Sequence, residues 1–157
     1  MEETHSVTEI ETPGGTPVRQ LSVFLHNRVG ALMALVRLLR DNNIEVLGLS
    51  VQESTEMTLV RLVLSDPETA GMLFMEKGIA HATTSIVVAE VRESEQDLAS
   101  CLAALLAAEI NIRLCYPLMA RPGRGALLAL HLDEPDMGAE SLNRAGFHVL
   151  MQEELSR

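Results

Sequence analysis

The sequence has very few aromatic residues and few basic ones. Of its 157 residues only 3% are aromatic, and 22 acidic residues outnumber 12 Lys and Arg, which gives a formal net charge of -10. Nucleic-acid binding needs basic side chains against phosphates and aromatic rings against bases. We therefore expect no nucleic-acid partner, and an acidic membrane surface is disfavoured on the same electrostatic grounds.

Signals for export, membrane insertion and metal binding are also missing. The N-terminus is acidic and polar where a secretory signal is basic and then apolar. The longest apolar helical stretch, residues 98–108, falls well short of the ~20 residues that span a bilayer. Cys101 and Cys115 lack metal-like spacing and are interpreted as small buried hydrophobic residues, and the histidines are scattered singly. We expect a cytoplasmic protein with no membrane partner, no metal and no cofactor.

Catalytic motifs are absent as well. The sequence contains neither a Gly-x-Ser-x-Gly motif nor a phosphate-binding Gly-rich loop with Lys-Ser/Thr. No paired carboxylates share an apolar helix face, and neither cysteine has a histidine nearby in sequence. The sequence therefore predicts a protein that is not an enzyme.

What the chain does have is a hydrophobic content of 47%, enough for a buried core. Residues 1–18 hold almost nothing apolar and are predicted to form a flexible N-terminal tail. From residue 19 onward, period-2 and helical patterns alternate in the order βαββαβ. Ser65 or Asp66 can cap the second helix, Pro67 suits its first position, and Gly78 suits its end. The expected strands are 20–26, 44–52, 58–64 and 79–84, and the expected helices are 31–41 and 67–77.

The same order is then repeated. The matched residues, each 68 positions apart (135−67, 146−78, 111−43), are Pro67 and Pro135, Gly78 and Gly146, and Asn43-Ile44 and Asn111-Ile112. The apolar stripe of the first helix fits better at 67, which indicates one residue inserted near the helix end. The expected strands of the second copy are 86–92, 112–120, 125–132 and 147–152, and its expected helices are 95–109 and 135–145.

A repeat of this kind indicates a tandem duplication. The predicted fold class is α+β, with two ferredoxin-like βαββαβ domains in tandem, each an antiparallel sheet with helices on one face. The expected domains are residues 19–85 and 86–157. The sequence between them is not enriched in Gly, Pro or Ser, so we expect the two to pack as one rigid body.

The turn that joins the first strand to the first helix is the candidate ligand site. The first N–H groups of a helix have no partner within the helix and lie at its positive end. Gly30 has no side chain to keep a ligand from them. The corresponding turn of the second copy, residues 94–97, has no glycine, and Ser94 with Asp97 can cap the helix internally. We therefore expect the first copy to bind the ligand. The second copy would support the first, dimerise or supply the other wall of a pocket.

These residues carry a resemblance to a known family. The run Asn27-Arg28-Val29-Gly30-Ala31-Leu32 between a strand and an amphipathic helix, followed by Asn43-Ile44 before the next strand, resembles the start of an ACT domain. The resemblance implies a regulatory module that binds a small amino acid at an interface between two copies. By position it nominates Asn27, Val29, Gly30, Ala31, Leu32, Asn43 and Ile44.

The resemblance also implies roles for these residues. Asn27 would hydrogen-bond the amino or carboxylate group of the ligand, and the amides near Ala31 and Leu32 would hold its carboxylate. The family often has an aspartate at the start of the loop, where this chain has His26-Asn27, so the preferred ligand can differ. An alternative is that Asn27 and Gly30 form a turn without a ligand and that Asn43 only ends the helix.

Three functions follow from this reading. The first is a non-catalytic protein that senses an amino acid and passes the change to a partner. The second is a regulatory subunit of an amino-acid biosynthetic enzyme, comparable to the small subunit of acetolactate synthase. The third is a dimerisation module without a ligand. We expect a homodimer, because open sheet edges gain from pairing.

Overall fold

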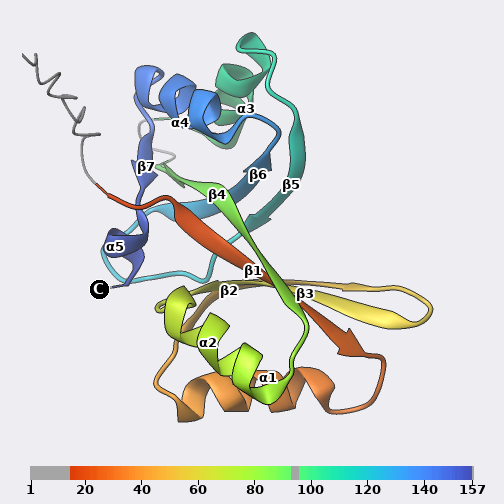
Figure 1. The fold of residues 1–157 in the computed structure, drawn as a ribbon. Coiled ribbons are helices and arrows are strands. Elements are labelled where there is room, and N and C mark those ends of the chain that lie inside the picture. Colours follow the sequence, from red (N-terminus) through yellow and green to blue (C-terminus); the bar gives the residue numbers. More distant parts are fainter. Residues whose placement is uncertain (1–14, 93–95, 157) are drawn as a thin grey trace, which may run out of the picture.

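A computed structural model of the chain describes residues 15–92 and 96–156 (Figure 1). Most of the predicted tail therefore lies outside the described residues, and the first strand begins at Val18. In chain order the elements are β1 (Val18–His26), α1 (Ala31–Asp41), β2 (Val46–Glu53), β3 (Met57–Leu64), α2 (Pro67–Lys77), β4 (His81–Val91), α3 (Leu98–Ala107), β5 (Ile112–Pro117), β6 (Ala126–Leu132), α4 (Pro135–Arg144), β7 (His148–Leu150) and α5 (Gln152–Leu155). None of the helices in the described ranges is long and apolar enough to span a membrane.

One long strand connects the two halves of the molecule. The strand order is β2-β3-β1-β4-β6-β5, with β7 also paired to β4, and all of these pairs are antiparallel. The part of β4 up to Ile86 pairs with β1, and the part from Val87 pairs with β6. The two strands expected at 79–84 and 86–92 are thus a single strand, because the chain continues without a turn from one set of partners to the next.

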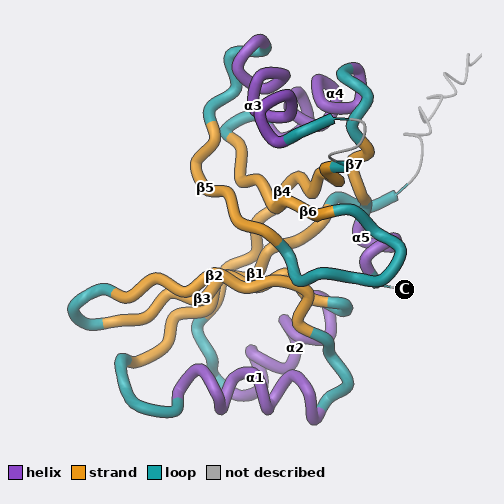
Figure 2. The backbone as a smooth tube through the Cα atoms, turned by 180° about the vertical axis from the view of Figure 1, so that it is seen from behind, coloured by secondary structure: helices purple, strands orange, loops and turns teal. Residues whose placement is uncertain are grey.

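The molecule is built in four layers. Helices α1 and α2 cover one face of the first half of the sheet, and α3 and α4 cover the outer face of the second half (Figures 1 and 2). The two helix-free faces meet in a core that takes residues from both halves, including Val18, Leu47, Val63, Leu127 and Leu150. Separate cores lie under each pair of helices. The predicted α+β fold, with antiparallel sheets and helices on one face, is confirmed.

The internal repeat is confirmed in the second half of each copy. Pro67 and Pro135 each begin a helix. Gly78 and Gly146 each follow a helix, and these glycines have positive φ angles of 69° and 91°. In both copies the next residue donates its N–H to a carbonyl five residues earlier. These positions carry the 68-residue separation that the sequence suggested.

The first half of each copy has a different separation. The buried residues Leu35 and Leu39 of α1 correspond to Cys101 and Leu105 of α3, which lie 66 residues later (101−35, 105−39). The match of Asn43-Ile44 to Asn111-Ile112 and the helix separation of 67 were therefore wrong. The physical reason is that the chain between corresponding paired residues is two residues longer in the second copy, with eight residues between Val51 and Val60 (60−51−1) and ten between Pro117 and Leu128 (128−117−1).

Other local expectations also need correction. Helix α3 begins at Leu98 instead of residue 95, with Asp97 as its N-cap, and Ser94 lies outside the described residues. Cys101 is buried as expected, but Cys115 is exposed, because it lies on the edge strand β5. The short helix α5 was not predicted, and its Leu155 is fully buried against the central core.

Candidate functional site

The side chain of Asn27 is engaged with the β2–β3 hairpin. Its Nδ2 donates to Glu53 Oε1 at 2.9 Å and to the carbonyl oxygen of Ser54 at 3.1 Å. Its Oδ1 accepts a hydrogen bond from Thr58 Oγ1 at 2.8 Å. Three of the four hydrogen bonds that this amide can make are thus used within the chain. Asn27 holds the β1–α1 turn against the hairpin.

The start of α1 is open to solvent. Gly30 is the N-cap residue with a φ of 85°, and no side chain caps the helix. A Cβ built on Gly30 would have no atom within 4 Å, and the neighbouring Val29 is fully exposed. The N–H of Ala31 donates weakly to the Arg28 carbonyl at 3.3 Å, and Leu32 packs partly against the core. The turn therefore has the uncapped, glycine-opened helix start that the sequence predicted.

The other two nominated residues lie at the far end of the same helix. Helix α1 has 11 residues, so its ends are roughly 16 Å apart. Asn43 has a φ of 58° and donates its N–H to the Arg40 carbonyl, which is the geometry of a helix end. Ile44 is buried in the core. Within one chain, Asn43 and Ile44 are not brought together with the turn at Gly30.

The corresponding turn of the second copy is capped. Asp97 accepts hydrogen bonds from the backbone N–H and the hydroxyl of Ser100, at 2.9 and 2.7 Å, and these bonds lower the pKa of its carboxyl group. A cavity of about 210 Å³ lies beside this turn, lined among others by Gln96, Gly146 and His148. The two copies therefore differ, with an open helix start in the first and a capped helix beside a small cavity in the second.

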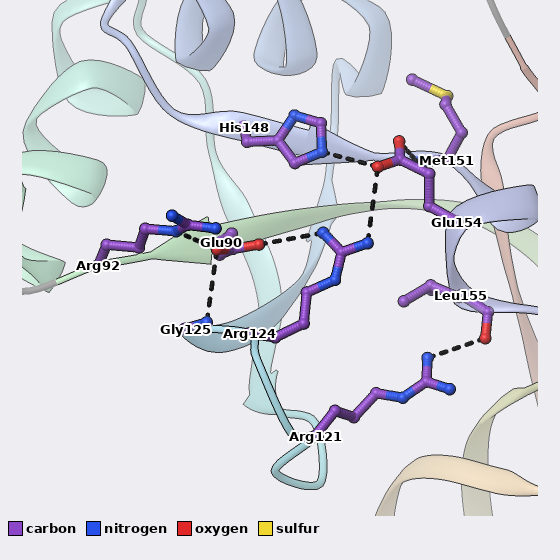
Figure 3. Close-up of polar contacts among 9 residues, drawn as sticks. All are labelled: Glu90, Arg92, Arg121, Arg124, Gly125, His148, Met151, Glu154 and Leu155. Atoms are coloured by element: carbon purple, nitrogen blue, oxygen red, sulfur yellow. Dashed lines mark hydrogen bonds and ion pairs between the residues drawn. The ribbon is translucent and has the colours of Figure 1, made fainter. Parts of the chain in front are cut away.

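A charged cluster that the sequence reasoning missed lies at the edge of this cavity (Figure 3). The side chain of Glu90 on β4 is only 1% exposed, and it accepts hydrogen bonds from Arg92, from Arg124 at 3.3 Å and from the backbone N–H of Gly125 at 3.4 Å. Burial raises the pKa of Glu90, but the hydrogen bonds from Arg92, Gly125 and Arg124 outweigh it, so the pKa lies below its ordinary value. A single acidic residue inside the apolar run of β4 was the available signal.

The same cluster holds α5 in place. Arg124 also approaches Glu154 of α5 at 3.9 Å, and His148 Nε2 lies 2.7 Å from Glu154 Oε2. Arg121 donates to the carbonyl oxygen of Leu155 at 2.9 Å, as Figure 3 shows. The β5–β6 connection and α5 thus close the central core from one side. Among the described residues, no three metal-binding side chains are grouped in a way that could hold an ion.

These features define a class of protein, a pair of ferredoxin-like domains that share one strand. The family model described as an ACT domain pair matches residues 16–157, and the chain belongs to this family. ACT domains are regulatory modules. The prediction from the sequence, a tandem ACT-domain regulatory protein, is therefore confirmed at the level of family. No curated protein matches the chain.

Solved structures share the fold. Protein BT0572 from Bacteroides thetaiotaomicron is 24% identical, with a TM-score of 0.79 over 90% of this chain and 97% of that one. The regulatory subunit of aspartate kinase from Thermus thermophilus, in a ligand-free form, is 10% identical, with a TM-score of 0.56 over 83% and 93%. The corresponding subunit from Thermus flavus is 14% identical, with a TM-score of 0.55 over 83% and 90%.

Proposed function

We propose that this protein is a non-catalytic sensor that binds a small amino acid at a domain or subunit interface and passes the change to a partner. The observation that carries the proposal is the start of α1, where Gly30 adopts a positive φ and leaves the helix uncapped and open. N–H groups that no side chain caps, at the positive end of a helix, suit the carboxylate of an amino acid. Membership of a family of regulatory modules agrees with this role.

In this proposal the ligand lies between two chains of a homo-oligomer. The amides of Ala31 and Leu32 hold its carboxylate, and Gly30 and Val29 allow its approach. Within one chain, Asn43 and Ile44 lie about 16 Å from the turn, too far to contact the same ligand. The neighbouring chain therefore supplies the second wall of the ligand site. Binding stabilises one arrangement of the interface, because a ligand shifts a conformational equilibrium only by its difference in affinity for the two states.

A separate contact, that of a homodimer, would use the outer face of α3, which lies on the opposite side of the molecule from α1 (Figure 1) and therefore does not close the site at Gly30. This helix has no charged residue in a chain of net charge -10, and Leu98, Leu102 and Leu106 are 49%, 36% and 78% exposed. An apolar surface of this kind marks an interaction site. Two copies can meet there without opposing like charges.

Regulation of an enzyme is the second candidate function. It is favoured by the likeness to structures described as regulatory subunits of aspartate kinase. A regulatory subunit of a cytoplasmic amino-acid biosynthetic enzyme would co-purify with a larger enzyme in a fixed ratio. A homodimer with neither an enzyme partner nor a ligand effect would instead indicate a dimerisation module.

The test of the sensing role is a thermal-shift screen of the twenty amino acids at millimolar concentration. A ligand at 100 times its Kd stabilises the protein by about 2.7 kcal/mol, which gives a rise of several degrees. Gly30→Val should abolish the shift caused by a ligand at this turn, because a side chain there fills the space that the ligand needs.

A matched control separates loss of binding from backbone strain. Gly78 also has a positive φ and open space around its Cβ position, but it lies at the end of α2. Gly78→Val should therefore lower the melting temperature as Gly30→Val does and still keep the ligand shift. A flat screen with well-folded protein would overturn the sensing role.

A further inference from the structure

A polar cleft separates the start of α2 from α5. It has a volume of about 530 Å³, within the range of small-molecule sites, and its lining includes Arg19, Asn43, Glu68, Asp66 and Glu153. It lies far from the turn at Gly30, since Asn43 is at the opposite end of α1. The cleft thus includes Asn43, which the sequence nominates, but it is distinct from the turn at Gly30.

Hydrogen bonds from three separate parts of the chain fix its walls. Gln152 of α5 donates to the carbonyl oxygen of Leu64 at 3.0 Å and accepts from the backbone N–H of Arg19 at 3.2 Å. The carboxylate of Glu153 accepts from the N–H of Thr16 at 3.0 Å. Because the strand ends and α5 are tied together beneath it, the cleft is preformed.

Three of the lining side chains have no partner within residues 15–92 and 96–156. Arg19, Asn43 and Glu68 make no side-chain hydrogen bond or ion pair there, and each is exposed at the cleft. Asp66, in contrast, caps α2 through Thr69, and Glu153 holds Thr16. A guanidinium, an amide and a carboxylate are therefore available to a ligand in one cleft.

The charges indicate the class of ligand. The lining contains one cation, Arg19, and three carboxylates, those of Asp66, Glu68 and Glu153, so its formal charge is −2. We propose that the cleft binds an amino acid with a cationic side chain. Arg19 pairs with the α-carboxylate of the ligand, and the carboxylates, with Glu68 free to turn toward it, hold its ammonium groups. An acidic amino acid would meet like charges there.

The second copy lacks this combination of charges. Ser85 occupies the register position of Arg19, 66 residues later (85−19), and Asp136 follows Pro135 as Glu68 follows Pro67. The cavity beside Asp136 is lined mainly by apolar residues such as Ile86, Val87 and Leu150. Asp136 is therefore a matched control for Glu68, with the same place in a helix but no neighbouring arginine among the residues that line its cavity.

The experiment is calorimetric titration of the full-length protein with three probes. Lysine carries all the charges, norleucine lacks the side-chain ammonium, and cadaverine lacks the carboxylate. We expect lysine to bind at least tenfold more tightly than either of the others. Arg19→Met and Glu68→Gln should each raise the lysine Kd at least tenfold, and Asp136→Asn should leave it unchanged.

The inference rests on the proposed function in taking a free amino acid as the ligand, and the variants separate the two claims. Lysine binding that survives in Arg19→Met and Glu68→Gln but is lost in Gly30→Val would overturn the cleft and leave the sensing role intact. Selective binding of uncharged or acidic amino acids would also overturn the proposal for the cleft and leave the sensing role intact. If none of the twenty amino acids binds, both claims are wrong.

Discussion

Leu118 packs directly on the backbone of Gly48, and this contact joins the two halves of the molecule. A Cβ built on Gly48 would lie 2.3 Å from Cδ2 of Leu118. Beside it, the N–H of Met119 donates to the carbonyl oxygen of Leu47 at 2.8 Å. Both Leu47 and Leu118 belong to the core between the sheets. Glycine is needed at this position for close approach.

Gly48→Ala should therefore destabilise the protein. Overpacking of a tight core costs about 1–3 kcal/mol, and the loss would appear as a lower urea midpoint. Gly71→Ala is the control, since the nearest atom to its Cβ position is 4.0 Å away and it lies inside α2. That change should stabilise the protein by about 0.5–1 kcal/mol through helix propensity. Equal effects of the two substitutions would mean that Leu118 moves aside without cost.

A buried hydrogen bond also crosses the central core. Tyr116 Oη donates to Gln20 Oε1 at 2.7 Å, and both side chains are buried. Tyr116→Phe leaves the Gln20 carbonyl without this donor, so we expect a loss of about 1–3 kcal/mol in the free energy of unfolding. The double variant Tyr116→Phe/Gln20→Leu should lose less than the two single changes added together. Strict additivity in denaturant unfolding would show that the pair is not coupled.

The ionisation of Tyr116 gives a separate test at high pH. Burial raises the pKa of Tyr116 above its ordinary value of 10, and the nearby Arg61 offsets this only in part. A raised folded pKa contributes stability that is present below the unfolded pKa and is lost as the pH rises toward the folded value. Because Tyr116 is the single tyrosine, its absorbance reports this group alone. Phenolate should appear together with unfolding, and titration near pH 10 in folded protein would contradict the burial.

The fold was predictable where it leaves local marks in the sequence. Pro67 and Gly78 mark a helix start and end by their backbone geometry alone, so their repeat at Pro135 and Gly146 was correctly read. The longer β5–β6 connection leaves no such mark, which is why the separation of 66 residues was missed. An apolar pattern shows that a strand is buried but not what covers it, so the packing of the helix-free faces became visible only in the structure.

The candidate site was predictable to the same extent. The sequence shows that a glycine opens the first helix, and the structure adds that this Gly30 has a positive φ. Asn27 donates to Glu53 and accepts from Thr58, which lie 26 and 31 positions away in sequence, and no local pattern predicts these bonds. The cleft at Arg19 was equally out of reach, because it depends on where α5 docks.

Glu90 should make stability depend on pH in the acid range. Glu90→Gln removes the charge that Arg92 and Arg124 share, which we expect to cost about 1–3 kcal/mol at neutral pH. Since the folded pKa of Glu90 is lowered, its contribution is present above the ordinary value of 4.5 and is lost as the pH falls through the folded pKa. The difference from the parent protein should therefore shrink on acidification. Glu76→Gln, on the exposed face of α2, should change stability little at any pH, and a Glu90→Gln effect that is constant from neutral to acid pH would argue against the buried ion pair.

The proposed homodimer depends on the outer face of α3, and Leu106→Glu tests it. Leu106 is 78% exposed, so a glutamate there leaves the fold of one chain intact but places a charge in the proposed contact. We expect a dimer in sedimentation equilibrium for the parent protein and at least a hundredfold weaker association for Leu106→Glu. Met75→Glu is the control, because Met75 is 76% exposed on α2, a helix that already carries charged residues. It should leave the dimer unchanged. A Leu106→Glu protein that dimerises like its parent would remove α3 from the interface, because a buried leucine contact cannot accept two opposed carboxylates without loss of affinity.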